Sequence, residues 1–248
     1  MHVSNPVVIV TAASKGIGAG VARFLSSRGY RLSLFARSDD VSTLADELRG
    51  MATQGSVQHE DDLRKLVKET LKTFGRIDAL VNNTGHPAKG DLLSPGDGVW
   101  QEGFELILRS VIQLARLITP VMRNQGGGSI VNISSYAAVR PELERPISSV
   151  FRAGLSAWTR LHAEYGAPYG IRVNSVLPGF IEMASGSPAC RHDSSWPLRA
   201  SGGTCPHGCL SLVVRCFLHH RTESGGRWRH GPNALNAGRS DNCHLAAC

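Results

Sequence analysis

The first 189 residues of this 248-residue chain contain no cysteine, because all six cysteines lie at position 190 or later. This excludes a disulfide framework or a cysteine-based zinc site from most of the chain. Aromatic residues make up only 6% of the sequence, and no apolar run reaches the length of about eighteen residues that a membrane-spanning helix needs. The chain opens Met-His-Val-Ser-Asn-Pro, which is not the pattern of a signal peptide. We therefore expect a cytoplasmic protein with no membrane partner.

Charge divides the chain into two parts. The formal net charge is +7, but residues 1–182 hold 20 Lys and Arg against 17 Asp and Glu, whereas residues 183–248 hold 7 against 3. A basic total raises the question of nucleic acid. Here most of it comes from a tail that also holds every cysteine, so we predict no nucleic-acid partner. We expect residues 1–182 to form one domain and residues 183–248 to be an atypical tail.

Residues 1–182 alternate between apolar runs of strand length and segments of helix length. The apolar runs are Val7–Val10, Arg31–Ala36, Ala79–Val81, Ile130–Ile133 and Arg172–Leu177. The helical segments are Gly18–Ser27, Val41–Arg49, Asp61–Phe74, Trp100–Met122 and Val150–Tyr165. Strands that alternate with helices indicate βαβ units and a parallel sheet covered on both faces. We predict a single α/β domain with a Rossmann-type, doubly wound parallel sheet.

Four short motifs follow these strands. They are Thr11-Ala-Ala-Ser-Lys-Gly-Ile-Gly18, Asn82-Asn-Thr-Gly85, Asn132-Ile-Ser-Ser135 and Pro178-Gly-Phe-Ile181. In a strand-to-helix turn, small residues let the backbone approach a pyrophosphate, and the amides at the helix N-terminus can bind it. In this order, the four motifs resemble those of the short-chain dehydrogenase/reductase family, in its 3-oxoacyl-acyl-carrier-protein-reductase-like branch. The resemblance covers residues 6–182.

The resemblance implies a nicotinamide cofactor. It assigns cofactor binding to Thr11, Ser14, Lys15, Gly16, Ile17, Gly18, Arg37, Ser56, Val57, Asn83, Gly85, Arg152, Pro178, Gly179 and Ile181. Ala36 stands where NAD-dependent members have an acidic residue, and Lys15 and Arg37 add two cations. Two cations without a carboxylate suit a 2′-phosphate, so we predict NADP(H) rather than NADH. The alternative is that both cations are solvated surface charges.

Two cofactor positions depart from the family pattern. Ala12 replaces the first glycine of the turn, which should crowd it, and Ser56 replaces an aspartate that contacts adenine.

The catalytic positions depart further from the family, whose members use an Asn-Ser-Tyr-Lys tetrad. Ser135 keeps the serine, but Ser148 occupies the tyrosine position, Arg152 the lysine position and Ile107 the asparagine position. A serine hydroxyl has no pKa suited to proton exchange near neutrality, and a planar guanidinium does not replace an ammonium. Tyr136 is an alternative phenol, although neighbouring strand residues point to opposite faces. The candidate catalytic residues are therefore Ser135, Ser148 and Arg152, and we expect no metal.

Two functions of different classes remain open. The first is an NADP(H)-dependent oxidoreductase, weakly active on the hydroxyl/carbonyl pair of a small-molecule carbonyl or alcohol substrate. The second is a catalytically silent NADP(H)-binding protein with a signalling or scaffold role. A third possibility, a defective product that barely folds, would melt without cooperativity and would not respond to NADP(H). The resemblance implies a homo-oligomer for an intact relative, but the atypical tail makes one doubtful for this chain.

The tail after Ile181 loses all periodicity, so we expect its elements to be disordered or non-native, and the last strand to be missing from the sheet edge. Read one base later, the codons of 217–230 permit Ser-Ser-Ile-Thr-Gly-Gln-Asn-Leu-Val-Val-Asp-Gly-Gly, the family's closing motif. We interpret the tail as frame-shifted by one base between about codons 182 and 198. Cys205-Pro-His-Gly-Cys209 and His219-His220 suggest zinc, but their spacing fits no zinc template.

Overall fold

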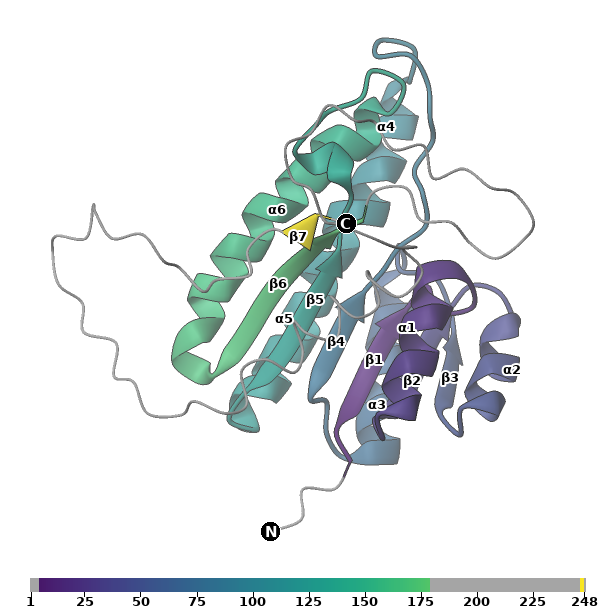
Figure 1. The fold of residues 1–248 in the computed structure, drawn as a ribbon, viewed down its shortest axis with the longest axis vertical. Helices are drawn as coiled ribbons and strands as arrows, with labels where there is room; N and C mark the ends of the chain where they lie inside the picture. The colour runs from purple at the N-terminus through teal and green to yellow at the C-terminus, as the bar shows by residue number, and fades with distance from the viewer. Residues whose placement is uncertain (1–4, 179–245, 248) are drawn as a thin grey trace, which may run out of the picture.

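The computed structural model describes residues 5–178 and 246–247. They form a parallel sheet of strand order β3-β2-β1-β4-β5-β6-β7 with helices on both faces (Figure 1). The strands are β1 (Val7–Thr11), β2 (Arg31–Ala36), β3 (Met51–Gln54), β4 (Ala79–Asn82), β5 (Gly128–Ile133), β6 (Ile171–Leu177) and β7 (Ala246–Ala247). The chain moves outward from β1 to β3 and then crosses back to β4 beside β1. This is the predicted Rossmann-type, doubly wound sheet.

Helices α1 (Gly16–Ser27) and α2 (Asp40–Glu47) lie in front of the sheet in Figure 1. Helices α3 (Glu60–Phe74) and α5 (Ser110–Asn124) lie behind it. Successive residues of a strand face opposite sides. Val8 of β1 accordingly packs in the cluster of α1 and α2, and Ile9 packs in the cluster of α3 and α5. Both faces are covered, which explains why β1 is apolar and buried almost throughout.

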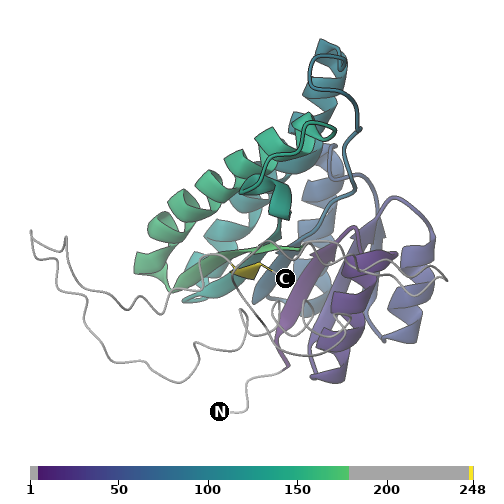
Figure 2. The same ribbon diagram turned by 45° about the horizontal axis from the view of Figure 1, so that its top comes forward.

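Two further α-helices reach the region beyond the carboxyl edge of the sheet. They are α4 (Asp97–Phe104) and the first turns of α6 (Pro146–Gly166), whose remaining turns pack along β6. Phe151 of α6 packs against the rings of Trp100 and Phe104 of α4, at centroid distances of 5.8 and 5.9 Å. Figure 2 shows α4 and the start of α6 projecting past the strands. The aromatic contacts therefore hold the first turns of α6 above the sheet edge.

Two elements differ from the sequence prediction. The strand β3 was not among the predicted apolar runs, because it is a short outer strand whose last residues, Thr53 and Gln54, are polar. The helix predicted over Trp100–Met122 forms as α4, a π-helical turn at Glu105–Arg109 and α5, without interruption of the chain's helical course. Turns of π-helix inside α-helices often occur at functional sites.

The expectation of a missing last strand is wrong for two residues. Val176 and Leu177 of β6 pair in parallel with Ala246 and Ala247 of β7. Strand pairing uses backbone groups, so two alanines suffice to cover this part of the edge. The frame-shift interpretation, Gly179, Ile181, the cysteines and His219-His220 lie outside the described residues. Within the described ranges, no helix is long and apolar enough to cross a membrane, and no three metal-ligating side chains cluster.

Candidate active site

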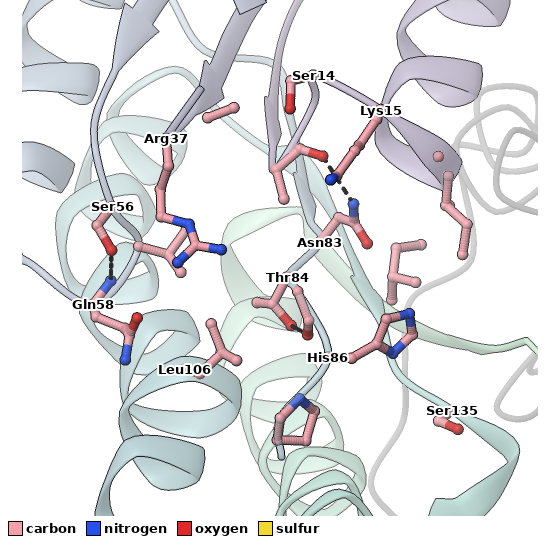
Figure 3. A pocket seen from close by; sticks show the side chains of 18 of the residues that line it. Ser14, Lys15, Arg37, Ser56, Gln58, Asn83, Thr84, His86, Leu106 and Ser135 are labelled. Carbon is pink, nitrogen blue, oxygen red and sulfur yellow. Dashed lines mark hydrogen bonds between the residues drawn. The ribbon is translucent and has the colours of Figure 1, made fainter. Parts of the chain in front are cut away.

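A cavity of about 880 Å³ opens at the carboxyl edge of the sheet, beside the crossover from β1 to β4. In open α/β sheets this crossover is where ligands bind. The described site residues predicted from the sequence line this cavity, except Thr11 and Gly18. They are Ser14, Lys15, Gly16, Ile17, Arg37, Ser56, Val57, Asn83, Gly85, Ser135, Ser148, Arg152 and Pro178. Figure 3 shows side chains from several loops converging on it.

The turn from β1 to α1 has the backbone conformation that glycine favours at two positions. Gly16 has φ +60°, and Ala12 has φ +45°. For a residue with a Cβ, this left-handed conformation costs roughly 1–2 kcal/mol. The crowding expected at Ala12 therefore takes the form of a strained backbone conformation. The turn nevertheless keeps its course and leads into α1.

Gly18 and Thr11 shape this turn from behind the cavity wall. A Cβ on Gly18 would collide with the carbonyl oxygen of Ala12 and lie 2.9 Å from the Asn83 Nδ2. The Thr11 hydroxyl donates to the Asn83 carbonyl at 2.7 Å and accepts from the Asn83 N–H at 2.9 Å. Asn83 Nδ2 donates to the Ala12 carbonyl at 3.3 Å (Figure 3). These contacts join the turn after β1 to the end of β4, and direct contact of Thr11 or Gly18 with a cofactor stays a prediction.

The outer end of the cavity presents positive charge. Lys15 precedes α1 and Arg37 follows β2, and both side chains extend toward the cavity in Figure 3. Ala36, at the position of the family's acidic residue, is buried. The acidic residue of the cavity lining is Asp40, which accepts a hydrogen bond from the Ser38 hydroxyl at 2.7 Å. This end can bind a phosphate group between two cations.

The third loop of the outer end follows β3. The Ser56 hydroxyl accepts from the Gln58 N–H at 3.3 Å, and the Ser56 N–H donates to the Asp62 carboxylate at 2.9 Å. Ser56 is thus engaged in its own turn. Ser56 and Val57 line the cavity wall, and their contact with a cofactor stays a prediction.

The inner end of the cavity combines Ser135, Ser148 and Arg152. Ser135 begins the turn after β5, and its hydroxyl accepts from the Ala137 N–H at 3.2 Å. Ser148 and Arg152 lie one turn apart on α6, so both face the same side of the helix. This spacing brings Ser148 and Arg152 to the cavity together, and Ser135 reaches the same cavity from the end of β5.

Arg152 is a buried cation. It is 4% exposed, and Nη1 donates to the Ile133 carbonyl at 2.8 Å. Its Nε has no hydrogen-bond partner among the described residues. Burial lowers the pKa of Arg152 to about 10, which still leaves the guanidinium charged at neutral pH. A buried donor without a partner is costly, and this cost falls on the Arg152 Nε.

Two other candidate positions are not among the described residues that line the cavity. Ile107, at the asparagine position, is 1% exposed and packs with Val111 and Leu155, whereas its neighbour Leu106 lines the cavity. Tyr136 begins a short helical turn and is not among the described residues that line the cavity. The structure therefore does not favour the phenol of Tyr136 as a replacement for the missing tyrosine.

Sequence reasoning missed His86, which lines the cavity and follows the Asn82-Asn-Thr-Gly85 motif directly (Figure 3). Its pKa is lowered, first by burial and then by the positive charges of Arg152, Lys89 and Arg145. The sequence signal that could have identified His86 was its position directly after this motif. Lys89 and Arg145 also line the cavity and were missed, because their loops have no periodic pattern.

The strand order, the glycine turn and the cavity at the crossover together define a nucleotide-binding α/β protein of the Rossmann type. The family model for short chain dehydrogenases matches residues 6–192. The chain belongs to the short-chain dehydrogenase family.

Individual dehydrogenases and reductases are also similar to this chain. The chain is 35% identical over 184 residues to Dehydrogenase/reductase SDR family member 4 of Caenorhabditis elegans, which covers 71% of each chain. It is 30% identical over 184 residues to a 3-oxoacyl-[acyl-carrier-protein] reductase of Staphylococcus epidermidis, covering 71% of this chain and 75% of the relative. Among solved structures, it matches L-sorbose reductase from Gluconobacter frateurii complexed with NADPH and L-sorbose. The TM-score is 0.69 at 30% identity, over 73% of this chain and 72% of the other.

Proposed function

We propose that this chain binds NADP(H) in preference to NAD(H) and interconverts a hydroxyl and a carbonyl group on a small molecule with low activity. The observation that carries the proposal is the pair of cations, Lys15 and Arg37, on a cavity wall where Ala36 replaces the acidic residue of NAD-dependent members. The similar L-sorbose reductase is itself complexed with NADPH.

The residues present fit a dinucleotide at two places. The absent Cβ at Gly18 keeps the glycine turn close to Asn83, as a backbone that approaches a pyrophosphate requires. The Arg152 guanidinium lies at the inner end of the cavity, at the position where the family's lysine holds the nicotinamide ribose. The bound cofactor supplies the hydride equivalent of the reaction.

The chain's own residues bind and orient more readily than they transfer protons. The Ser135 hydroxyl can donate to a carbonyl oxygen, and the Arg152 guanidinium can hold ribose hydroxyls through its planar fork. Ser148 cannot act as the proton donor that a tyrosine provides, and loss of such a group costs roughly 10²–10⁴ in rate. Low activity follows from this replacement.

The same replacement supports a second candidate, an NADP(H)-binding protein without turnover. One experiment separates the two: NADPH binding measured by calorimetry, beside NADPH oxidation measured with ethyl acetoacetate and a panel of ketones. Binding with slow turnover supports the oxidoreductase. Binding without turnover on any ketone supports the silent protein. Absence of binding contradicts both.

We also infer that residues 1–182 are the dinucleotide-binding domain and that residues 183–248 are a frame-shifted tail. Sequencing the coding DNA across codons 175–240 tests the inference. A one-base correction that restores an Asp-Gly-Gly ending supports it, and a confirmed frame contradicts it. Homo-oligomerisation, which is expected of an intact relative and doubtful for this chain, can be tested by light scattering. Cytoplasmic location stays a prediction.

A further inference from the structure

The histidine that sequence reasoning missed, His86, lies in a cavity that needs a group for proton transfer. Ser148 occupies the position of the family's tyrosine, and a serine hydroxyl is not suited to proton exchange near neutrality. The other ionisable side chains of the described lining are lysines, arginines and one aspartate, Asp40, which opens α2. Histidine is the side chain whose ordinary pKa lies in the neutral range. His86 is therefore the candidate for proton transfer within the described part of the cavity.

The register of the sheet places the backbone of His86 near that of Ser135. Asn82 of β4 pairs in parallel with Asn132 of β5, and neighbouring strands lie about 4.8 Å apart. The chain therefore leaves the carboxyl edge of the sheet at adjacent points. Ser135 follows Asn132 by three residues, and His86 follows Asn82 by four. Both residues line the cavity, and Figure 3 shows them on the same side of it.

A backbone hydrogen bond connects the loop of His86 to the segment that precedes α6. The Gly90 N–H donates to the Glu144 carbonyl at 3.1 Å. Ser148 follows Glu144 by four residues, lies in the first turn of α6 and lines the cavity. The loop of His86 is thus held between the end of β5 and the start of α6, where Ser135 and Ser148 form the inner end.

The charges around His86 favour its neutral form. Partial burial lowers the pKa of His86, and the positive charges of Arg152 on α6, of Lys89 on its own loop and of Arg145 before α6 lower it further. With a pKa below the ordinary 6.5, the imidazole is mostly uncharged at neutral pH. A neutral imidazole has a ring nitrogen that can accept a proton.

On the basis of the proposed function, we propose that His86 accepts the hydroxyl proton of an alcohol substrate when the alcohol is oxidised to a carbonyl compound. The O–H bond breaks as an N–H bond forms on the imidazole, and the oxidant is NADP⁺, which takes the hydride from the carbinol carbon and becomes NADPH. The imidazolium then returns its proton to water, because His86 is exposed to solvent. The Ser135 hydroxyl accepts from the Ala137 N–H at 3.2 Å, which leaves its own hydrogen for the substrate oxygen.

The first measurement is the rate of NADPH formation from NADP⁺ and a panel of secondary alcohols that includes ethyl 3-hydroxybutyrate, between about pH 5 and pH 8. The rate should rise with pH to a plateau, with a midpoint below 6.5, because only neutral His86 accepts a proton. His86→Gln should lower the plateau by roughly 10²-fold and remove this pH dependence. His59→Gln, at an exposed position outside the described cavity lining, is the matched control.

Chemical rescue separates proton transfer from a positioning role. Imidazole added to His86→Ala should restore part of the lost rate, because a free base can enter the space that the ring leaves. The His86→Gln variant should not respond to imidazole in the same way, because its side chain still fills that space.

The second measurement does not depend on turnover. The chain is labelled with ¹³C in its histidine rings and saturated with NADPH, so that added ethyl 3-hydroxybutyrate cannot be oxidised. The His86 signal, assigned by its loss in His86→Gln, should shift when the alcohol is added, whereas the His59 signal should not.

The outcomes distinguish this inference from the proposed function. An unchanged rate and pH profile in His86→Gln overturns the inference and leaves the oxidoreductase standing. A His86 signal that ignores the alcohol in the NADPH complex also overturns it. If the parent chain forms no NADPH from any alcohol, the oxidoreductase and the inference are contradicted together.

Discussion

The two ends of the cavity differ in how far each depends on backbone geometry and on single side chains. At the outer end, two cationic side chains stand beside a backbone turn that is shaped by Gly16, by Gly18 and by the contacts of Asn83. At the inner end, the proposed chemistry depends on two single side chains, Ser148 and Arg152, on a well-packed helix. Backbone geometry is maintained by the whole core, whereas one side chain changes without disturbing the fold. A chain of this family can therefore keep a nucleotide site after its proton-transfer group is gone.

The largest expected effect comes from restoring the inner end. Ser148→Tyr combined with Arg152→Lys should raise NADPH oxidation by about 10²–10⁴, because a tunable phenol and an ammonium would replace the serine and the guanidinium. The measurement is the rate with a ketone substrate at saturating NADPH. Ser148→Tyr alone is the matched comparison, and a double variant that binds NADPH without any gain in rate would show that more than these side chains is missing.

At the outer end, Gly18→Ala should disrupt the cofactor site by displacing the backbone of the glycine turn. The added Cβ collides with the Ala12 carbonyl and crowds Asn83, which should cost about 3 kcal/mol of unfolding free energy and abolish NADPH binding. Denaturant unfolding and NADPH titration measure both effects. Gly98→Ala, where a Cβ meets open space in α4, is the control and should be neutral or slightly stabilising. Equal behaviour of the two variants would contradict the account.

The far end of α6 should make stability depend on pH. His162 is buried and hydrogen-bonded to the Thr119 hydroxyl at 2.9 Å, and burial lowers its pKa below 6.5. The unfolded chain then binds more protons than the folded chain, so this stabilisation is complete above pH 6.5 and is lost as the pH falls toward the folded pKa.

His162→Gln should therefore flatten the fall in Tm between about pH 7.5 and pH 5.5. His59→Gln, at an exposed position, is the control, and an unchanged pH profile in His162→Gln would exclude the effect.

Ala12→Gly should give the smallest change. It relieves the strain of a positive φ, roughly 1–2 kcal/mol, but glycine adds flexibility to the unfolded chain, which offsets about 0.4–1 kcal/mol. A net stabilisation of about 1 kcal/mol or less is expected in denaturant unfolding. A clear loss of stability would show that the Ala12 methyl group makes contacts that outweigh the strain.

Most of the fold follows from the sequence because five strands are rich in apolar residues and alternate with segments of helix length. The strand β3 was not predicted, because Thr53 and Gln54 are polar residues at the end of a four-residue strand. The helix α6 begins at Pro146, four residues before the predicted start at Val150. Proline is favoured at the first position of a helix, so Pro146 can open α6 although proline interrupts the interior of a helix.

The residues of the candidate site also differ in whether the sequence could predict them. Lys15 and Arg37 were found because they adjoin recognisable strand ends. His86 and Lys89 were missed because only the tertiary structure places their loop beside α6.

The central claim is that the outer end binds a 2′-phosphate between Lys15 and Arg37. Titration of the chain with NADPH and with NADH tests it most directly, with Arg37→Gln beside the parent chain. We predict that NADPH binds at least about tenfold more tightly than NADH, and that Arg37→Gln removes most of the difference. Equal affinity for the two nucleotides, or tighter binding of NADH, would contradict the claim.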